Sequence, residues 1–224
     1  MTKTSAEVRA AELAVLEQEA LGCSRCRLAE SRTQVVFGAG APDADVMIIG
    51  EGPGQREDEQ GLPFVGPSGR LLEQLLGEIG LERSQVYIGN VVKCRPPGNR
   101  DPRPDEIDKC KGYLRAQLTL VDPKVVVTLG NFSSKLLLRT EIGITKLRGH
   151  AYPWWGRQLV PTFHPAAALR GSARVLEDMR YDFTLIADVV AGRIEAPDPT
   201  PSGTDSEPAP ADAPTDPEQM DLFS

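Results

Sequence analysis

The sequence predicts an α/β protein with three layers, in which helices cover both faces of a central, mainly parallel sheet of four strands. Short apolar runs recur along the chain, and helical patterns separate them. Glycines follow the ends of several runs, where a strand would turn into a helix. Strands that alternate with helices pair in parallel, because each helix carries the chain back to the starting edge of the sheet.

The elements are expected in the following order. A charged pattern rich in Ala, Glu and Leu predicts a first helix over about residues 5–20. Periodic apolar residues predict later helices over about 66–79, 104–120 and 173–191, and a further one that starts at 131. The expected strands are 34–37, 46–49, 86–92 and 125–129, and a β-rich stretch over 147–163 contains the strand 159–163. We assign Trp154 and Trp155 in that stretch to packing, with base stacking as the alternative.

Residues 195–224 differ in composition from the rest of the chain. They hold eight of the 32 acidic residues, seven of the 19 prolines and none of the 25 basic residues. Such a segment buries too little apolar surface to order itself, so we expect a folded domain over 1–194 and a disordered tail over 195–224. Without the tail, the formal charge changes from −7 to +1. The overall acidity therefore does not exclude nucleic acid as a ligand.

The sequence contains no apolar run near the roughly 20 residues of a membrane span. Its first 20 residues lack the apolar centre of a signal peptide. We therefore expect a soluble, cytoplasmic monomer.

The segment from Gly50 to Gly66 follows the strand 46–49 and is rich in glycine and carboxylates. In open α/β sheets, ligands bind at such turns between a strand and a helix. The glycine spacing matches no phosphate-binding motif, and Glu51 would repel a phosphate. We interpret the glycines as space for a flat neutral ligand, and a tight turn with solvated acids is the alternative.

The four cysteines of the chain suggest a metal site. Cys23 and Cys26 form a C-x2-C pair, and 15 residues separate Cys94 from Cys110. In a cytosolic protein this arrangement favours a metal over disulfides. Four thiolates suit either Zn²⁺ or a [4Fe–4S] cluster, and the spacing does not decide between them. The segment 95–109 carries the basic residues Arg95, Arg100, Arg103 and Lys109 and contains four prolines, so a metal at its two ends would hold these cations against a polyanion.

Three further residues are expected on the side of the sheet where the 50–66 segment lies: Phe64 within that segment, and Asn90 and His164 at strand ends. Asn90 offers a donor and an acceptor side by side, which matches the edge of a pyrimidine. Phe64 can stack on such a ring. His164 follows the last strand and can hydrogen-bond to charge that develops on a leaving group. Together these residues indicate a pocket for a pyrimidine base.

These motifs resemble the family 4, iron–sulfur branch of the uracil-DNA glycosylases, over roughly residues 23–190. The matching motifs are GEGPG-x-x-ED at 50–58, G-x-PFVG at 61–66, NVVKCRPP-x-NR at 90–100, His164-Pro165 and the four cysteines. The resemblance implies the fold of that superfamily, removal of uracil from DNA without a metal-activated water, and a [4Fe–4S] cluster in preference to zinc. It also implies single- or double-stranded uracil-containing DNA as substrate and association with the nucleoid.

The resemblance implies roles for individual residues of the pocket. Phe64 would stack on the flipped uracil, Asn90 would bind its polar edge, and His164 would donate to O2 as the base departs. Glu51 and Gly52 would line the pocket beside the sugar.

Other residues would act on specificity and on DNA. Glu57 would crowd the C5 position, where thymine carries its methyl group. Asn99 would position water or the DNA backbone. Arg95 and Arg100 of the segment 95–109 would contact DNA, and Leu169 and Arg170 would fill the space that the flipped base vacates.

The sequence departs from related branches at two points. Where some relatives carry an Asp that activates water, this chain has Gly52, so Glu51, Asn99 and backbone-held water remain as alternatives for that role. The segment 95–109 contains no His, so we expect turnover rather than the covalent trapping of a related branch.

The last residues, Gln219–Phe223, resemble the bacterial sliding-clamp-binding peptide, and a frayed terminus is the alternative. For the protein as a whole, the main hypothesis is a monofunctional uracil-DNA glycosylase. The competing hypotheses are a non-catalytic Fe–S or zinc nucleic-acid-binding protein of the same fold, and a glycosylase for a different damaged base.

Overall fold

The computed structural model describes residues 6–171 and 173–194, and the sheet within them has six strands. The strands follow one another in the order β1-β3-β2-β4-β6-β5. The four inner strands, β3 (Tyr87–Asn90), β2 (Val46–Gly50), β4 (Val125–Leu129) and β6 (Arg157–Thr162), pair in parallel. They confirm the predicted parallel core. The sheet is mixed, however, because β1 (Ala39–Gly40) and β5 (Tyr152–Trp154) add an antiparallel strand at each edge.

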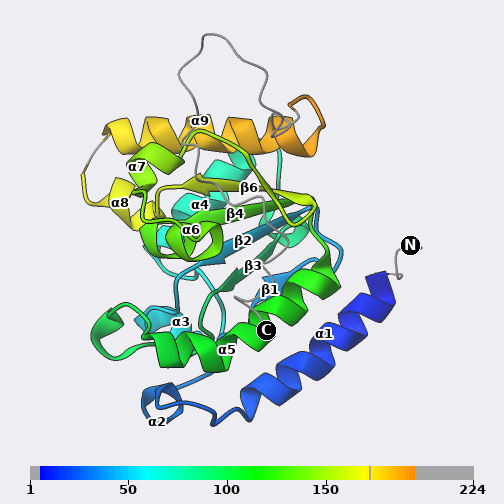
Figure 1. Ribbon diagram of the computed structural model, residues 1–224, viewed down its shortest axis with the longest axis vertical. Coiled ribbons are helices and arrows are strands. Elements are labelled where there is room, and N and C mark those ends of the chain that lie inside the picture. The colour runs from blue at the N-terminus through cyan, green and yellow to red at the C-terminus, as the bar shows by residue number, and fades with distance from the viewer. Residues whose placement is uncertain (1–5, 172, 195–224) are drawn as a thin grey trace.

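Helices cover both faces of this sheet, as the three-layer prediction requires (Figure 1). The helices α1 (Ala6–Leu21) and α5 (Pro104–Val121) lie on one face, and α4 (Pro67–Glu78) and α9 (Ala173–Val190) lie on the other. Shorter helices connect the strands to these layers: α2 (Leu28–Ser31), α3 (Gln55–Gln60), α6 (Asn131–Leu138), α7 (Ile144–Leu147) and α8 (Pro165–Leu169), with the 3-10 turns η1 (Arg83–Gln85) and η2 (Pro97–Asn99). No described helix is both long enough and apolar enough to cross a membrane.

Alternate residues of the central strands feed two separate cores. Met47 and Ile49 of β2 pack in the core that contains residues of α1 and α5. Val46 and Ile48 pack in the core that contains residues of α4 and α9. All five residues of β2 are buried, as are all five of β4. Because both faces of the inner strands are covered, these strands read in the sequence as continuous apolar runs.

The expected strand over 34–37 is wrong. The backbone amides of Thr33 and Gln34 donate to the buried carboxylate of Asp58, at 2.9 and 3.3 Å. The amide of Val36 donates to the carbonyl of Lys93 at 2.8 Å. These bonds tie the segment to α3 and to the chain after β3, so the antiparallel pairing begins only at β1.

The β-rich stretch that contains the tryptophans forms a hairpin. Trp155 (φ 50°) and Gly156 (φ 71°) both have the left-handed backbone of a tight turn between β5 and β6. Trp154 is buried, its Nε1 donates to the carbonyl of Leu137 at 3.0 Å, and its ring stacks on Trp155 with centroids 4.8 Å apart. The packing interpretation of Trp154 is confirmed.

Candidate active site

The carboxyl ends of the four parallel strands meet at one edge of the sheet, and a cleft of about 1370 Å³ opens there. The register places Gly50 beside Asn90 and Leu129 beside Thr162. Segments far apart in sequence therefore meet at this edge, as expected for parallel strands. The cleft lining contains most of the predicted site residues, namely Glu51, Gly52, Glu57, Phe64, Asn90, Asn99, Arg100, His164 and Arg170.

Gly50 allows Phe64 and Asn90 to approach each other at the floor of the cleft. A Cβ atom at Gly50 would lie 2.4 Å from Asn90 Oδ1 and 2.8 Å from Phe64 Cζ. Phe64 itself has a φ of 52°, which is unfavourable for a bulky residue. Arg83 supports this conformation by donating to the carbonyl oxygens of Pro63 and Phe64. Strained backbone of this kind clusters at ligand sites.

Asn90 brings an unpaired hydrogen-bond acceptor to the same place. Its side chain is 1% exposed, and its Oδ1 has no hydrogen-bond partner among the described residues. A buried acceptor without a partner costs about 1–3 kcal/mol. A ligand N–H that reaches Oδ1 would remove this cost, so the pocket favours a ligand with a donor on its edge.

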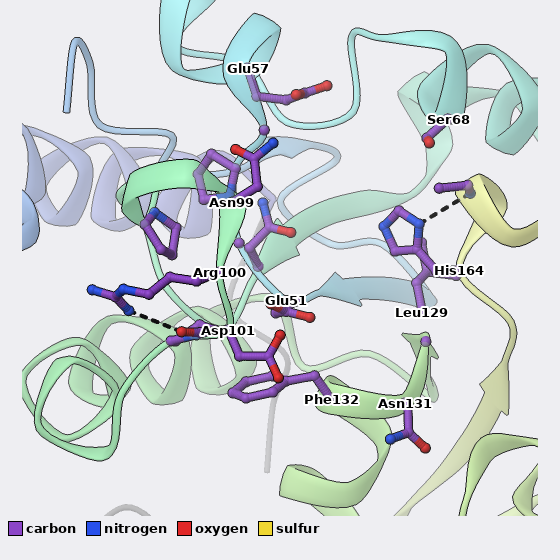
Figure 2. A pocket seen from close by; sticks show the side chains of 18 of the residues that line it. Glu51, Glu57, Ser68, Asn99, Arg100, Asp101, Leu129, Asn131, Phe132 and His164 are labelled. Atoms are coloured by element: carbon purple, nitrogen blue, oxygen red, sulfur yellow. Dashed lines mark hydrogen bonds between the residues drawn. The ribbon is translucent and has the colours of Figure 1, made fainter. Parts of the chain in front are cut away.

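His164 supplies a neutral donor. Its Nδ1 accepts a hydrogen bond from the amide of Ala166 at 3.2 Å (Figure 2), so the proton of the neutral ring lies on Nε2. Burial, together with the positive charge of Arg170, lowers the pKa of His164 to about 4, against an opposing effect of Glu57. The ring centroid lies 5.8 Å from that of Phe64. His164 is therefore an uncharged N–H donor at neutral pH, beside the stacking ring.

A second glycine makes room for this imidazole. Gly130, between β4 and α6, has a φ of 92°, and a Cβ there would lie 3.1 Å from His164 Cβ. Its amide donates to the carbonyl of Thr162 at 2.9 Å. The turn after β4 is thus bonded to the end of β6, just before His164.

Glu57, on α3, holds the loop that carries Phe64. Its Oε1 accepts from the amides of Val65 and Gly66 at 2.9 and 3.0 Å. The carboxylate therefore has a fixed position at the cleft wall. Sequence reasoning did not foresee this loop contact, and the role of Glu57 against thymine stays a prediction.

Glu51 lies beside a residue that sequence reasoning missed, Asp101. The two side chains point toward each other at the wall of the cleft (Figure 2). Burial, together with the charge and hydrogen bonding of Asp101, raises the pKa of Glu51 to about 7. The one signal in the sequence is that Asp101 directly follows the Asn99-Arg100 motif.

The segment between Cys94 and Cys110 is stabilised mainly by hydrogen bonds among its own side chains. Arg95 Nε donates to Asn99 Oδ1 at 2.7 Å. Arg100 binds both oxygens of the buried Glu106, at 2.6 and 2.8 Å. Arg100 thus has a structural partner that the DNA-contact prediction did not include, and its contact with DNA stays a prediction.

The two residues predicted to fill the vacated stack lie at the end of α8. Leu169 is 51% exposed, and Arg170 lines the cleft. Both residues follow His164 along the chain, and their role in the vacated stack stays a prediction.

All four cysteines line one small cavity of about 20 Å³. Cys94 Sγ accepts from Arg32 at 3.3 Å, and Cys110 Sγ accepts from the amide of Lys93 at 3.3 Å. Within residues 6–171 and 173–194, however, no three His, Cys, Asp or Glu side chains form a group that could hold a metal ion. The structure thus brings the four predicted ligands to one cavity.

Comparison with known proteins identifies the family. A model of the uracil DNA glycosylase superfamily matches residues 37–184. The chain belongs to this superfamily. It is 48% identical over 164 residues to a type-4 uracil-DNA glycosylase of Sulfurisphaera tokodaii, an alignment that covers 69% of this chain and 74% of that protein.

Two further type-4 uracil-DNA glycosylases align over most of their length. The protein of Thermotoga maritima is 42% identical over 172 residues, which cover 74% of this chain and 90% of that protein. The protein of Archaeoglobus fulgidus is 39% identical over 180 residues, which cover 77% of this chain and 90% of that protein. The uracil DNA glycosylase superfamily match contains the whole pocket from Glu51 to His164, together with Cys94 and Cys110. It begins after Cys23 and Cys26, so the first cysteine pair lies outside the part matched by the superfamily.

Proposed function

We propose that this protein is a DNA-repair enzyme that flips uracil out of DNA and hydrolyses its N-glycosidic bond, leaving an abasic site. The observation that carries the proposal is the single pocket formed by the ring of Phe64, the unpaired Oδ1 of Asn90 and the Nε2–H of His164. A flat base with N–H and C=O groups on its edge complements this set. The names of the similar proteins support uracil as that base.

The residues act in sequence on the flipped base. Extrusion from the helix costs a few kcal/mol, and least for a mispaired base. Phe64 then stacks on the ring, and Asn90 accepts the N3–H at its otherwise unpaired oxygen. The bond between C1′ and N1 breaks with its electron pair on the base, and the charge is shared with O2. His164 Nε2–H donates to O2, and removing one such preorganised donor typically costs ~3 kcal/mol.

Selection against thymine is assigned to Glu57. Its carboxylate is fixed by two backbone amides at the wall of the pocket. A fixed group that occupies the space of the C5 methyl rejects thymine by steric conflict. Glu51 or Asn99 would then place the water that attacks the sugar.

We assign a [4Fe–4S] cluster to Cys23, Cys26, Cys94 and Cys110, in preference to zinc. Four sulfurs at ~2.3 Å from one zinc ion would lie only about 3.8 Å apart. A cluster spaces its thiolates more widely, because each one binds a different iron. The four cysteines share one cavity, and four thiolates in one place suit such a cluster. The cluster would serve as a structural clamp on the chain after Asn90.

The cofactor assignment has a direct test. Protein purified without oxygen should contain iron and acid-labile sulfide and show a visible absorption band. Stoichiometric zinc without iron or a visible band would contradict the assignment.

Several sequence predictions complete the proposal. DNA contacts are assigned to Arg95, Arg100, Leu169 and Arg170 beside the cleft. The clamp-binding peptide at Gln219–Phe223 lies outside the described residues and stays a prediction. The monomeric state and a cytoplasmic, nucleoid-associated localisation also stay predictions.

The activity is tested by incubating the full-length protein with oligonucleotides that contain U·G, U·A, single-stranded U, T·G or hypoxanthine, followed by alkaline cleavage. Strand breaks at uracil and none at T·G are expected. Absence of product from every uracil substrate would refute the proposal. Binding without product would then support the non-catalytic alternative, and product from hypoxanthine alone would support a different damaged base.

A further inference from the structure

Two carboxyl groups face each other on the wall of the cleft. Glu51 follows β2 and is partly buried, whereas Asp101 follows η2 and is exposed at the rim. Figure 2 shows the two side chains pointing toward each other below Asn99. Two ionised carboxylates that face each other repel, and the repulsion is relieved when one of the two is protonated.

Charged side chains of both signs line the cleft around the pair. Arg100 is the neighbour of Asp101 in the chain, but its guanidinium is bound to Glu106. The other cations of the cleft are Arg56, Lys135, Arg139 and Arg170. The other acids are Glu57, Glu59 and Glu141, and His164 completes the titratable set. Burial and Asp101 are the influences that raise the pKa of Glu51 to about 7.

We propose that Asp101 is a positioning residue that shares one proton with Glu51 and thereby sets the pH at which the Glu51 carboxylate becomes available for catalysis. The inference rests on the proposed glycosylase function. While Glu51 is protonated, its O–H donates to Asp101 and the carboxyl is held at the wall. When the proton leaves, Glu51 becomes the base beside the sugar.

The C1′–N1 bond breaks, its electron pair leaves with uracil, and a water oxygen forms a new bond to C1′. The water proton passes to the Glu51 carboxylate, and His164 Nε2–H stabilises the departing uracil anion. Only the ionised form of Glu51 can take this proton, so the rate should rise with pH through about 7.

Replacing Asp101 tests whether this residue sets the pKa of Glu51 or only supports the structure of the cleft wall. Asp101→Asn removes the negative charge, so the pKa of Glu51 should fall, while burial keeps it above the ordinary value. A fall of about one unit is a reasonable size for the loss of one neighbouring charge. At pH 6 the variant would then work at about half of its plateau rate, whereas the unchanged protein would work at about a tenth.

The test is the single-turnover rate of uracil release from a U·G duplex between pH 5 and 9. Four full-length proteins are compared: the unchanged protein, Asp101→Asn, Glu51→Gln and the control Asp105→Asn. Asp105 is also an exposed acid, and it pairs with Arg27 on the surface. We expect the rising limb to shift down in Asp101→Asn, to disappear in Glu51→Gln and to stay in place in Asp105→Asn. Asp101→Ser serves as a second variant if the first one does not fold.

The outcomes distinguish this inference from the function on which it rests. If the unchanged protein releases no uracil, the glycosylase proposal itself fails. If it releases uracil but Asp101→Asn lowers the rate equally at every pH, Asp101 has only a structural role and the inference is overturned. A rising limb that persists in Glu51→Gln would overturn it as well.

Discussion

Replacing Gly50 by alanine tests whether the close approach of Phe64 and Asn90 is needed for activity. The new methyl group would lie 2.4 Å from Asn90 Oδ1 and 2.8 Å from Phe64 Cζ. Ordinary van der Waals contact begins near 3.4 Å. The shortfall is therefore about 1.0 Å at Asn90 and about 0.6 Å at Phe64, and both groups must move away from position 50.

The size of the effect follows from this displacement. A misplacement of about 1 Å can cost 10²-fold in rate, which corresponds to about 2.7 kcal/mol in the barrier. We expect Gly50→Ala to lower the single-turnover rate of uracil release by about 100-fold. Gly50 does not have a positive φ, so its backbone accepts alanine and the protein should still fold.

Gly112→Ala is the matched control. Gly112 lies within α5, where an added Cβ would meet nothing within 4 Å. Activity should be unchanged, and the melting temperature should rise by roughly 2–4 °C, because alanine stabilises a helix interior by about 1 kcal/mol. If Gly50→Ala keeps activity within threefold of the unchanged protein, the pocket does not depend on this contact and the site geometry described above is wrong.

Three further predictions address other parts of the molecule. His164→Ala should slow uracil release by about 100-fold, and because the pKa of His164 is about 4, this loss should be the same at pH 6 and pH 8; a loss confined to pH 6 would contradict the neutral-donor role. Asp182→Asn should destabilise the protein by about 3–5 kcal/mol, as measured by urea unfolding, since buried Asp182 binds Arg148 at 2.6 and 2.9 Å and Thr162 at 2.6 Å; a change below 1 kcal/mol would refute it. Deleting Gln219–Ser224 should leave uracil release intact and abolish co-purification with a sliding clamp, and unchanged co-purification would end the clamp hypothesis.

The parallel core was predictable from sequence because its signals are local. The run 125–129 and the helix expected over 104–120 correspond to β4 and α5 within one residue. The helix α3 was missed inside the glycine-rich segment, since it has only six residues. Gly61, with a φ of 72°, ends it. A short polar helix between glycines has no apolar periodicity to reveal it.

The site could be predicted for those residues whose location follows from their position at the end of a strand. Asn90 and His164 come together because parallel strands end at one edge, and the strand ends are visible in the sequence. The partners of Arg100 and Glu51 could not be predicted in the same way. Arg100 pairs with Glu106, and Glu51 interacts with Asp101. Both interactions depend on the conformation of the loop after η2, which the sequence pattern does not determine.

The position of β6 in the sheet has a consequence for how the protein folds during its synthesis. Gly50, Asn90 and Gly130 leave the ribosome long before His164, yet β6 must pair with β4 before His164 reaches the cleft. The helix α9 then packs over both strands from the last part of the folded domain. Domains complete such long-range pairings late, because distant segments must first meet. The pocket of Phe64, Asn90 and His164 is therefore complete only when the carboxyl-terminal part of the folded domain has docked.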